Sequence, residues 1–533
     1  MSDATIARRI ARSAVLSLIL IAGSIATAAA ADKVIRFVPQ ADPGVLDPVV
    51  NSSYIGQEHG YMVYDTLFSF DEKYIPQPEM VERYAVSADG LTYTFTLRGG
   101  MKFTDGSVVR AEDAVASIKR WAPRDTNGRK MVELGMTLTI VDDRTFTLTL
   151  REKWGSVLDS MAKIAGSALF VMRARDAETP PTTAISEIVG SGPFRFVKPD
   201  YVPASLLAYE RNPGYASRPE PSSFYAGGKR VAVDRVEWRI MPDPATATAA
   251  LGAGEVDVYE TPPLELLVSL RNNPNVVVAV HNTLGAMAYY RPNFLYPPFD
   301  NVKARQALLY LADQADYMQA AIGSDPSTWR VCWAWLACGS PGGTEAGADA
   351  FRKSDPAKAK ALFREAGYKG EKLIMMQPTD QPVLRAVTEV AVQRMKEIGL
   401  NLDVQAMNWG TLVGRRAKQD PPDAGGWNLF FTWTFGLDLA NPLANAALAA
   451  PCDRKNYPGW PCDAEIERLR DAWGKASDPV ERQKVATQIQ ERSVAYVPYA
   501  PVGQYTQPIA YRSSLKNFLK VPLPVMWNVE KTQ

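Results

Sequence analysis

Residues that usually carry catalysis or hold metals are scarce in this sequence. The 533 residues include only two histidines, His59 and His281. A zinc site built on histidines needs more of them, and a Ser-His-Asp triad could draw only on these two. The nucleophile elbow Gly-x-Ser-x-Gly does not occur, and residues 339–347 are glycine-rich without the Lys-Ser/Thr ending of a phosphate-binding loop. We therefore expect no enzyme, metal or cofactor, and retain a secreted hydrolase only as a remote alternative.

The four cysteines lie in two close pairs. Cys332 and Cys338 have five residues between them, and Cys452 and Cys462 have nine. Four cysteines allow three connectivities, of which two local loops are the simplest. The two-residue spacings of a zinc ribbon are absent. The cysteines therefore fit disulfides in an oxidising compartment.

Tryptophans are concentrated in the second half of the chain. Eight of the twelve fall within residues 283–499. Because ligand pockets are mostly apolar with few polar anchors, this enrichment suits non-covalent capture of a ligand. Core packing is the alternative, and it is expected for Trp473, which lies on a predicted helix. Trp333 and Trp335 lie inside the first cysteine loop, where a disulfide could present one of them to a cleft.

Length and charge limit the class of protein. A chain of 533 residues exceeds one hydrophobic core, so two or three compact units are expected. A hydrophobic content of 46% with 22% charged residues is typical of globular protein. The formal net charge of +1 is too small to attract nucleic acid or an anionic membrane.

The N-terminal residues 1–31 have the pattern of a secretory signal peptide. Arg8, Arg9 and Arg12 precede a short apolar run at residues 15–25, and four alanines follow at residues 28–31. The run is too short to span a bilayer. The pattern predicts cleavage before Asp32 and export from the cytoplasm.

Strand and helix patterns change along the chain. Alternating apolar and threonine residues predict strands at 92–98 and 145–150, around a helix at 111–121. After residue 230 the order becomes strand, helix, strand, which indicates an α/β fold with parallel strands. The segments expected there are 231–241, 244–253, 256–259, a long helical stripe at 301–322, a helix opening at 355, then 372–376, 382–398, 400–406 and a helix at 479–495.

Eight motifs occur in an order that resembles a known family. They are LDP at 46–48, VYDTLF at 63–68, SADGLTYTFTLRGGMKFTDG at 87–106 with AEDAV at 111–115, GSGPF at 190–194, RNPGY at 211–215, GEVD at 254–257, PFDNVKARQAL at 298–308, and residues 355–367. Together they resemble family 5 of the extracytoplasmic solute-binding proteins (the peptide/nickel class, dipeptide- and oligopeptide-binding type), which serve ABC importers. The resemblance covers nearly the whole chain after the signal segment.

This resemblance implies a two-lobe α/β clamshell of the periplasmic binding protein type, with an extra strand-rich subdomain. The first lobe would combine residues 32–55, 186–282 and 500–533, and the subdomain would be residues 56–185. The second lobe would be residues 283–499. Ligand would stabilise the closed state, and the permease subunits in the inner membrane would recognise it. The protein is expected to act as a monomer and to bind no nucleic acid.

The resemblance also implies a ligand site between the lobes. In peptide binders of this family an aspartate in a tryptophan-containing loop holds the ligand amine, and the matching segment here is FTWTFGLDLANP at 431–442. Trp433 corresponds to the family tryptophan and Asp438 is the nearby carboxylate, although a cap or a loop-stabilising role is the alternative for Asp438. Asn408 and Trp409 follow a predicted strand end, and Tyr54 is the candidate from the first lobe. The peptide pattern departs at Leu439 and its neighbours, so an oligosaccharide or an opine-type ligand is the alternative.

Overall fold

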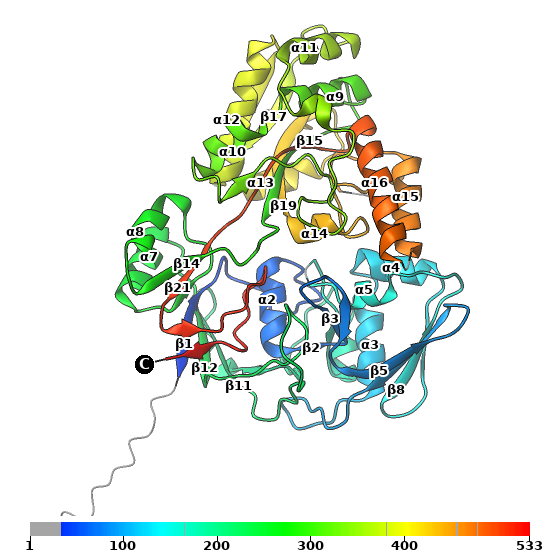
Figure 1. The fold of residues 1–533 in the computed structure, drawn as a ribbon, viewed down its shortest axis with the longest axis vertical. Helices are drawn as coiled ribbons and strands as arrows, with labels where there is room; N and C mark the ends of the chain where they lie inside the picture. Colours follow the sequence, from blue (N-terminus) through cyan, green and yellow to red (C-terminus); the bar gives the residue numbers. More distant parts are fainter. Residues whose placement is uncertain (1–32, 165, 380, 455–456, 477, 533) are drawn as a thin grey trace, which may run out of the picture.

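The structure is a computed structural model that describes residues 33–164, 166–379, 381–454, 457–476 and 478–532 (Figure 1). The expected signal peptide lies outside these residues. Three sheets, of seven, six and four strands, organise the described chain. We call the seven-stranded sheet and its helices the first lobe, the six-stranded sheet and its helices the second lobe, and the four-stranded sheet and its helices the strand-rich subdomain. In Figure 1 the second lobe lies above the other two.

The first lobe brings together segments from distant parts of the sequence. Its sheet consists, in spatial order, of β10 (Phe194–Phe196), β11 (Leu206–Arg211), β12 (Arg235–Arg239), β1 (Val34–Val38), β13 (Val258–Tyr259), β21 (Ile509–Arg512) and β14 (Val276–Ala279). Helix α2 (Tyr54–Val63) buries Tyr61 and Met62 in the same core as Trp238 of β12. Helices α7 (Pro244–Ala253) and α8 (Leu267–Arg271) pack beside β14 and β13. The predicted boundary at residue 56 is therefore wrong for α2, which belongs to the first lobe because of this packing.

The strand-rich subdomain is an antiparallel sheet covered by helices. Its strands are, in spatial order, β5 (Val81–Val86), β6 (Thr92–Leu97), β8 (Thr145–Thr149) and β7 (Thr137–Ile140). Its helices are α3 (Ala111–Trp121), α4 (Thr126–Glu133), α5 (Val157–Met161) and α6 (Ala174–Ala177). Phe95 and Phe146 are paired across β6 and β8 and are fully buried, as their alternation with threonines predicts. Two short ribbons adjoin it, namely β2 (Asp65–Thr66) with β9 (Phe170–Val171), and β3 (Phe68–Phe70) with β4 (Pro76–Pro78).

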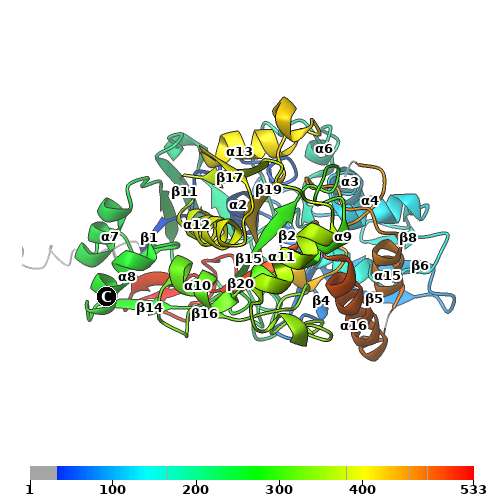
Figure 2. The ribbon, with the colours of Figure 1, turned by 90° about the horizontal axis from the view of Figure 1, so that it is seen from above.

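The second lobe has a mixed sheet. Its strands are, in spatial order, β16 (Trp329–Arg330), β20 (Ala500–Tyr505), β15 (Ala286–Pro292), β19 (Leu429–Phe435), β17 (Leu373–Pro378) and β18 (Leu402–Met407). Its helices are α9 (Val302–Leu311), α10 (Gln314–Ile322), α11 (Pro356–Glu365), α12 (Pro382–Glu397), α13 (Trp409–Arg416), α14 (Gly436–Ala440), α15 (Ala464–Lys475) and α16 (Pro479–Tyr496). Seen from above, α12 lies over this sheet and α15 and α16 lie at its far side (Figure 2). None of the helices that the structure describes is long and apolar enough to cross a membrane.

Several helices begin where an aspartate precedes a proline. Asp243, Asp355 and Asp478 each accept a hydrogen bond from a backbone N–H in the first turn of α7, α11 and α16, respectively. The following proline suits the first helical position because its fixed φ is helical and its missing N–H is not needed there. These three helix starts are confirmed as the sequence predicts them.

The long helical stripe at residues 301–322 is two helices and not one. Asn301 caps α9 as predicted, accepting from the N–H of Lys303 at 3.0 Å. The helix ends at Leu311, because Ala312 has a ψ of 90° and leaves the helical region. α10 then restarts after Asp313. The apolar period continues across the break, and this is why the pattern alone predicts a single helix.

Two chain segments connect the lobes. One runs from β14 to β15 and the other from β20 to β21. They touch at Gly285, where a Cβ would lie 2.0 Å from the carbonyl oxygen of Tyr505, and its φ of +54° also favours glycine. Because β20 pairs with β15, residues 500–505 lie in the second lobe, which corrects the predicted boundary at residue 500.

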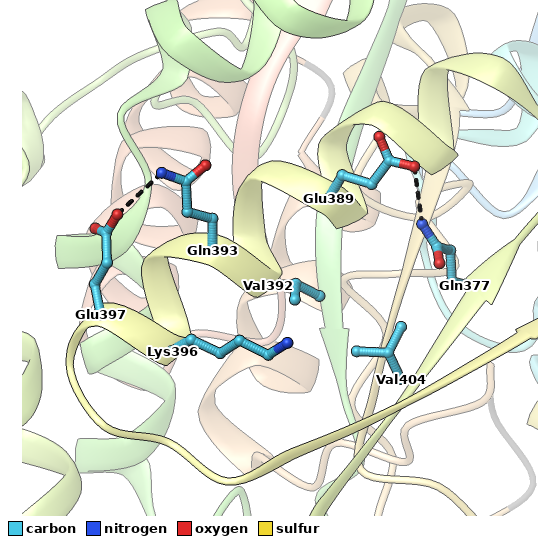
Figure 3. A pocket seen from close by; sticks show the side chains of 7 residues that line it. All are labelled: Gln377, Glu389, Val392, Gln393, Lys396, Glu397 and Val404. Carbon is cyan, nitrogen blue, oxygen red and sulfur yellow. Dashed lines mark hydrogen bonds between the residues drawn. The ribbon is translucent and has the colours of Figure 1, made fainter.

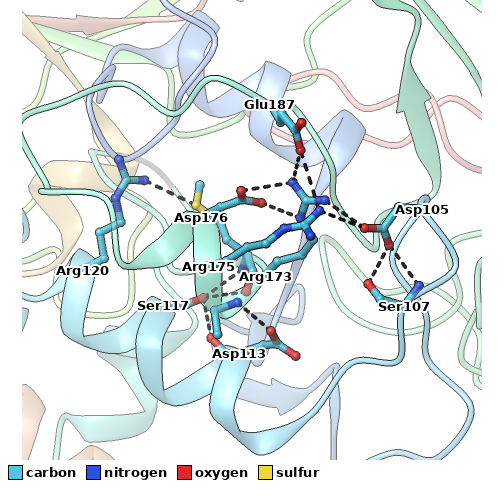
Figure 4. A network of polar contacts seen from close by, with 11 residues as sticks. Asp105, Ser107, Asp113, Ser117, Arg120, Arg173, Arg175, Asp176 and Glu187 are labelled. Atoms are coloured by element: carbon cyan, nitrogen blue, oxygen red, sulfur yellow. Dashed lines mark hydrogen bonds and ion pairs between the residues drawn. The ribbon is translucent and has the colours of Figure 1, made fainter.

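Buried arginines fasten the subdomain internally and to the first lobe. Arg173 donates to Asp105, Asp176 and Glu187 at 2.8, 2.6 and 2.8 Å (Figure 4). Arg120 of α3 pairs with Asp47 at 2.7 Å, and both side chains are 1% exposed. Asp47 is the acid of the LDP motif, so this motif has a structural role in the fold.

Candidate ligand-binding site

The parallel strands of the second lobe end at one edge of its sheet. β17 pairs in parallel with β18 up to Pro378 and Met407, and with β19 through Met376 and Phe430. Asn408 and Trp433 therefore lie toward the same edge, where ligands of α/β proteins usually bind. Asn408 is exposed and caps α13 by accepting from the N–H of Thr411 at 2.8 Å.

Residues of the two lobes meet at Asp438. This aspartate lies in the first turn of α14, just after β19. Tyr54 is the first residue of α2, which Ser53 caps. The Tyr54 hydroxyl donates to Oδ2 of Asp438 at 2.5 Å, across 384 residues of sequence. The structure thus brings together three predicted residues, Tyr54, Trp433 and Asp438. Asp438 lies within α14 and is not one of its caps, which are Phe435 and Asn441.

Aromatic rings enclose this contact. The Tyr54 ring lies 4.0 Å from the ring of Phe435 and is stacked at 6.4 Å on the ring of Trp433. Trp433 and Phe435 lie 5.2 Å apart. All three side chains are half-buried. Such rings can flank either the apolar side chains of a peptide or the faces of a sugar.

The surroundings set the charge of this group. Burial raises the pKa of Asp438, and the Tyr54 hydrogen bond and the Lys163 ammonium oppose that shift. Burial and the neighbouring Asp438 carboxylate raise the pKa of Tyr54 well above its usual value. Tyr54 is therefore a neutral donor at neutral pH. Asp438 offers a carboxylate acceptor in an apolar setting, where a ligand ammonium would be strongly favoured.

Sequence reasoning missed the contribution of the strand-rich subdomain. Lys163 follows α5, and its Nζ donates to Asp125 Oδ2 at 2.5 Å and to the carbonyl oxygen of Gly166 at 3.3 Å. A Cβ on Gly166 would lie 4.0 Å from Oδ1 of Asp438. No local pattern in the sequence indicates that the charge of Lys163 acts on Asp438, because Asp125 and Asp438 lie in other elements.

Trp333 and Trp335 lie in the core of the second lobe and not beside Tyr54. Both are at most 1% exposed, and the Trp335 indole N–H donates to the carbonyl oxygen of Tyr499 at 2.9 Å. Their loop is drawn inward because buried glutamines bind its backbone, at distances of 2.6 Å for Gln314 to the Cys332 N–H and 3.0 Å for Gln490 to the Trp335 N–H. The expected presentation of these tryptophans to a cleft is therefore corrected.

Trp409 lies near the same sheet edge but faces another cluster. It is half-buried against a group that includes Trp427 and Phe430. The Arg416 guanidinium lies 5.3 Å from its ring centre. Its role in ligand contact stays a prediction.

Both disulfides have the simplest pairing. Cys332 is bonded to Cys338 with an S–S distance of 2.08 Å, and Cys452 to Cys462 with 1.99 Å. The first closes the loop that carries Trp333 and Trp335. The second lies just before the start of α15.

A surface depression of about 690 Å³ lies elsewhere on the second lobe (Figure 3). It contains none of the predicted ligand-binding residues. The residues that line it come from α12 and the neighbouring strands, and they are Gln377, Glu389, Val392, Gln393, Lys396, Glu397 and Val404. Two hydrogen bonds, Gln393 to Glu397 and Gln377 to Glu389, already join its polar side chains.

A buried acid pair lies one helical turn below Tyr54. Glu58 of α2 and Glu260, which follows β13, share the side-chain amide of Gln40, with distances of 2.7 and 2.8 Å. Burial, reinforced by the Glu260 carboxylate, raises the pKa of Glu58 well above its usual value. Burial raises the pKa of Glu260 to about 7. At neutral pH the folded pair therefore retains protons that the unfolded chain has lost.

We expect the free energy of unfolding to fall as pH rises from near 5 through 7. At pH values between the ordinary glutamate pKa of 4.5 and the raised values, the folded state binds more protons than the unfolded state. Each extra bound proton lowers the free energy of unfolding by about 1.4 kcal/mol per pH unit. Glu58→Gln should flatten this dependence and gain stability relative to the parent at pH 8. The measurement is urea unfolding from pH 5 to 8.5, with the exposed Glu389→Gln as control. Equal slopes in both variants and the parent would rule the acid pair out as the cause.

Comparison with known proteins places this chain in a family. The sequence profile of the bacterial extracellular solute-binding proteins, family 5 Middle, matches residues 76–453. The chain belongs to family 5. The expected two-lobe α/β fold is confirmed. The family is described as extracellular solute-binding proteins of bacteria.

Relatives within family 5 span almost the whole chain. The probable peptide ABC transporter periplasmic-binding protein y4tO of Sinorhizobium fredii is 39% identical over 508 residues, covering 95% of this chain and 94% of that protein. The glutathione-binding protein GsiB of Salmonella typhi is 25% identical over 497 residues, covering 90% of each.

Solved family 5 structures share the fold at lower identity. The dipeptide-binding protein of Pseudoalteromonas sp. SM9913, in complex with Met-Leu, has a TM-score of 0.76 at 19% identity and covers 94% of this chain and 100% of its own. The binding protein AgaA of A. tumefaciens R10, in complex with agropinic acid, has a TM-score of 0.76 at 20% identity and covers 94% and 99%.

Proposed function

We propose that this chain is the periplasmic substrate-binding component of an ABC importer, and that it captures peptides or peptide-like small solutes. The meeting of Tyr54 and Asp438 across the two lobes carries this proposal. A carboxylate within an aromatic frame suits a ligand that has an ammonium group beside an apolar side chain. The name of the 39% identical relative supports the same ligand class.

In this function the protein makes and breaks no bond. Solute contacts both lobes and stabilises the closed arrangement, because it interacts with more groups there than in an open one. Permease subunits in the inner membrane then receive the solute from the closed form. We propose the two chain segments near Gly285 and Tyr505 as the hinge, because they are the two connections between the sheets of the lobes.

A thermal-shift screen of ligand-stripped protein tests this proposal. The panels are dipeptides, tripeptides, opines and oligosaccharides. A ligand at 100 times its Kd should stabilise the protein by about 2.7 kcal/mol, which is a clear shift of the melting temperature. Shifts with peptides support the proposal. Shifts confined to opines or sugars would replace the ligand class and keep the solute-binding role.

Asp438→Asn should weaken binding of a peptide with a free amino terminus by about 30- to 100-fold. Removing one partner of a buried charge pair costs about 2–3 kcal/mol. An N-acetylated form of the same peptide carries no ammonium group, so its weaker binding should change little in the variant. Isothermal titration of both peptides checks this, with the exposed Asp423→Asn as control. An equal loss for both peptides would show that Asp438 does not read the amine.

A further inference from the structure

The second lobe makes a second contact, with the strand-rich subdomain. Helices α4 and α5 of the subdomain meet α15 and α16 of the second lobe at the right of Figure 1. Strands β14 and β21, which lead into the two chain segments between the lobes, lie at the left. The view from above shows the same separation (Figure 2). The contact therefore lies on the side of the molecule away from the hinge.

The apolar part of this contact depends on a glycine. Trp154, just before α5, is fully buried, and its indole edge lies over Gly474 of α15. A Cβ on Gly474 would lie 2.4 Å from Nε1 of Trp154, so no larger residue fits without movement. Ser156 also donates to the carbonyl oxygen of Gly474 at 3.0 Å. One continuous hydrophobic cluster joins the cores of the subdomain and the second lobe.

The charged part is a two-pronged ion pair. Arg482 of α16 donates to both carboxylate oxygens of Asp159 in α5, at 2.9 and 3.0 Å. The two side chains are 21% and 11% exposed. The Arg482 guanidinium also stacks on Trp473, 4.8 Å from the ring centre. Lys130 of α4 pairs with Asp471 of α15 at 2.8 Å. A guanidinium that binds both oxygens of a carboxylate, as Arg482 does with Asp159, makes a stronger and more specific contact than a single hydrogen bond.

We propose that this contact is a latch that holds the second lobe against the subdomain before any solute is bound. The inference rests on the proposed function, in which the lobes must separate to admit a solute. None of the latch residues belongs to the site around Asp438, so the latch stabilises closure independently of the ligand. When the closed form is already populated, less of the solute's binding free energy is needed to close the protein. The apparent affinity is the intrinsic affinity for the closed form multiplied by the fraction of protein that is closed, so it rises with that fraction.

Small-angle X-ray scattering of the ligand-free protein tests the latch directly. Arg482→Gln removes the charged hydrogen bonds to Asp159 and should lower the closed-to-open ratio by about tenfold, which increases the radius of gyration. The matched control is Arg468→Gln, because Arg468 of α15 pairs only with Glu465 of the same helix at 2.7 Å, among the contacts of the described residues. A radius equal to that of the parent and the control would overturn the proposal.

A second variant removes the dependence on charge. Gly474→Ala places a methyl group against Trp154 and should also increase the radius, whereas Gly252→Ala, whose nearest neighbour would be 3.8 Å away, should not. A melting temperature that falls with an unchanged radius would mean a fixed structural interface and would overturn the latch. If Arg482→Gln does not fold, Asp159→Asn removes the same ion pair from the other side. A larger radius then supports the latch, and a radius equal to that of the parent overturns it. Failure to find a solute would not alter these ligand-free results.

Discussion

Asp47→Asn should lower the free energy of unfolding by about 3–5 kcal/mol. Asp47 and Arg120 are both buried, and removing one partner leaves an unpaired charge in an apolar interior. The carboxylate also accepts from the backbone N–H groups of Val49 and Ile185, at 3.0 and 2.9 Å. An asparagine would turn an amide donor toward the Arg120 guanidinium or toward one of these N–H groups. The change should therefore loosen the joint between α3 and the first lobe.

Urea unfolding followed by circular dichroism measures this loss. The control is Asp143→Asn, because Asp143 is 80% exposed and its pair with Arg110 contributes little. A loss below 1 kcal/mol in Asp47→Asn, or an equal loss in the control, would contradict the buried-charge argument.

Arg291→Met should cost about 4 kcal/mol of stability in the second lobe. Arg291 of β15 is fully buried and donates to the carbonyl oxygens of Ala447, Tyr457, Pro458 and Pro498, at 2.8, 3.2, 2.6 and 3.1 Å. Methionine fills a similar volume but donates no hydrogen bond. The carbonyl oxygen of Tyr457 also accepts from the Trp460 N–H at 3.3 Å, whereas the other three lose the Arg291 donor, and each unsatisfied buried group costs about 1–3 kcal/mol before relaxation. Among the described residues, Arg291 is the one buried cation that donates to these carbonyl oxygens.

Two readouts separate this effect from a general loss of stability. The unfolding midpoint should fall, and limited proteolysis should cut first within residues 447–459. Arg239→Met is the control, since Arg239 is 44% exposed and pairs with Glu237 on its own strand. Unchanged proteolysis in Arg291→Met would show that another contact holds this segment.

Local signals in the sequence predicted most of the fold elements. The helices at 111–121 and 244–253 occur with the predicted bounds, because apolar period and caps are both local. The break at Ala312 was not predictable from period alone. The boundaries at residues 56 and 500 shift because α2 and β20 pack on neighbours that only the assembled sheets reveal.

The site was less accessible from sequence. The pairing of Tyr54 with Asp438 follows from the family resemblance and not from any spacing in the chain. The direction of the first disulfide loop depends on the amides of Gln314 and Gln490, which come from α10 and α16. The charge of Lys163 acts on Asp438 from the strand-rich subdomain, and no local pattern in the sequence indicates this.

The position of β21 in the first lobe has a consequence for how the chain folds during synthesis. This strand lies between β13 and β14, although it follows them by more than two hundred residues. Until Ile509–Arg512 have been made, those two strands present open edges that can pair with other chains. The first lobe therefore completes last, after the second lobe has its full sequence, and a prematurely terminated chain is exposed to aggregation.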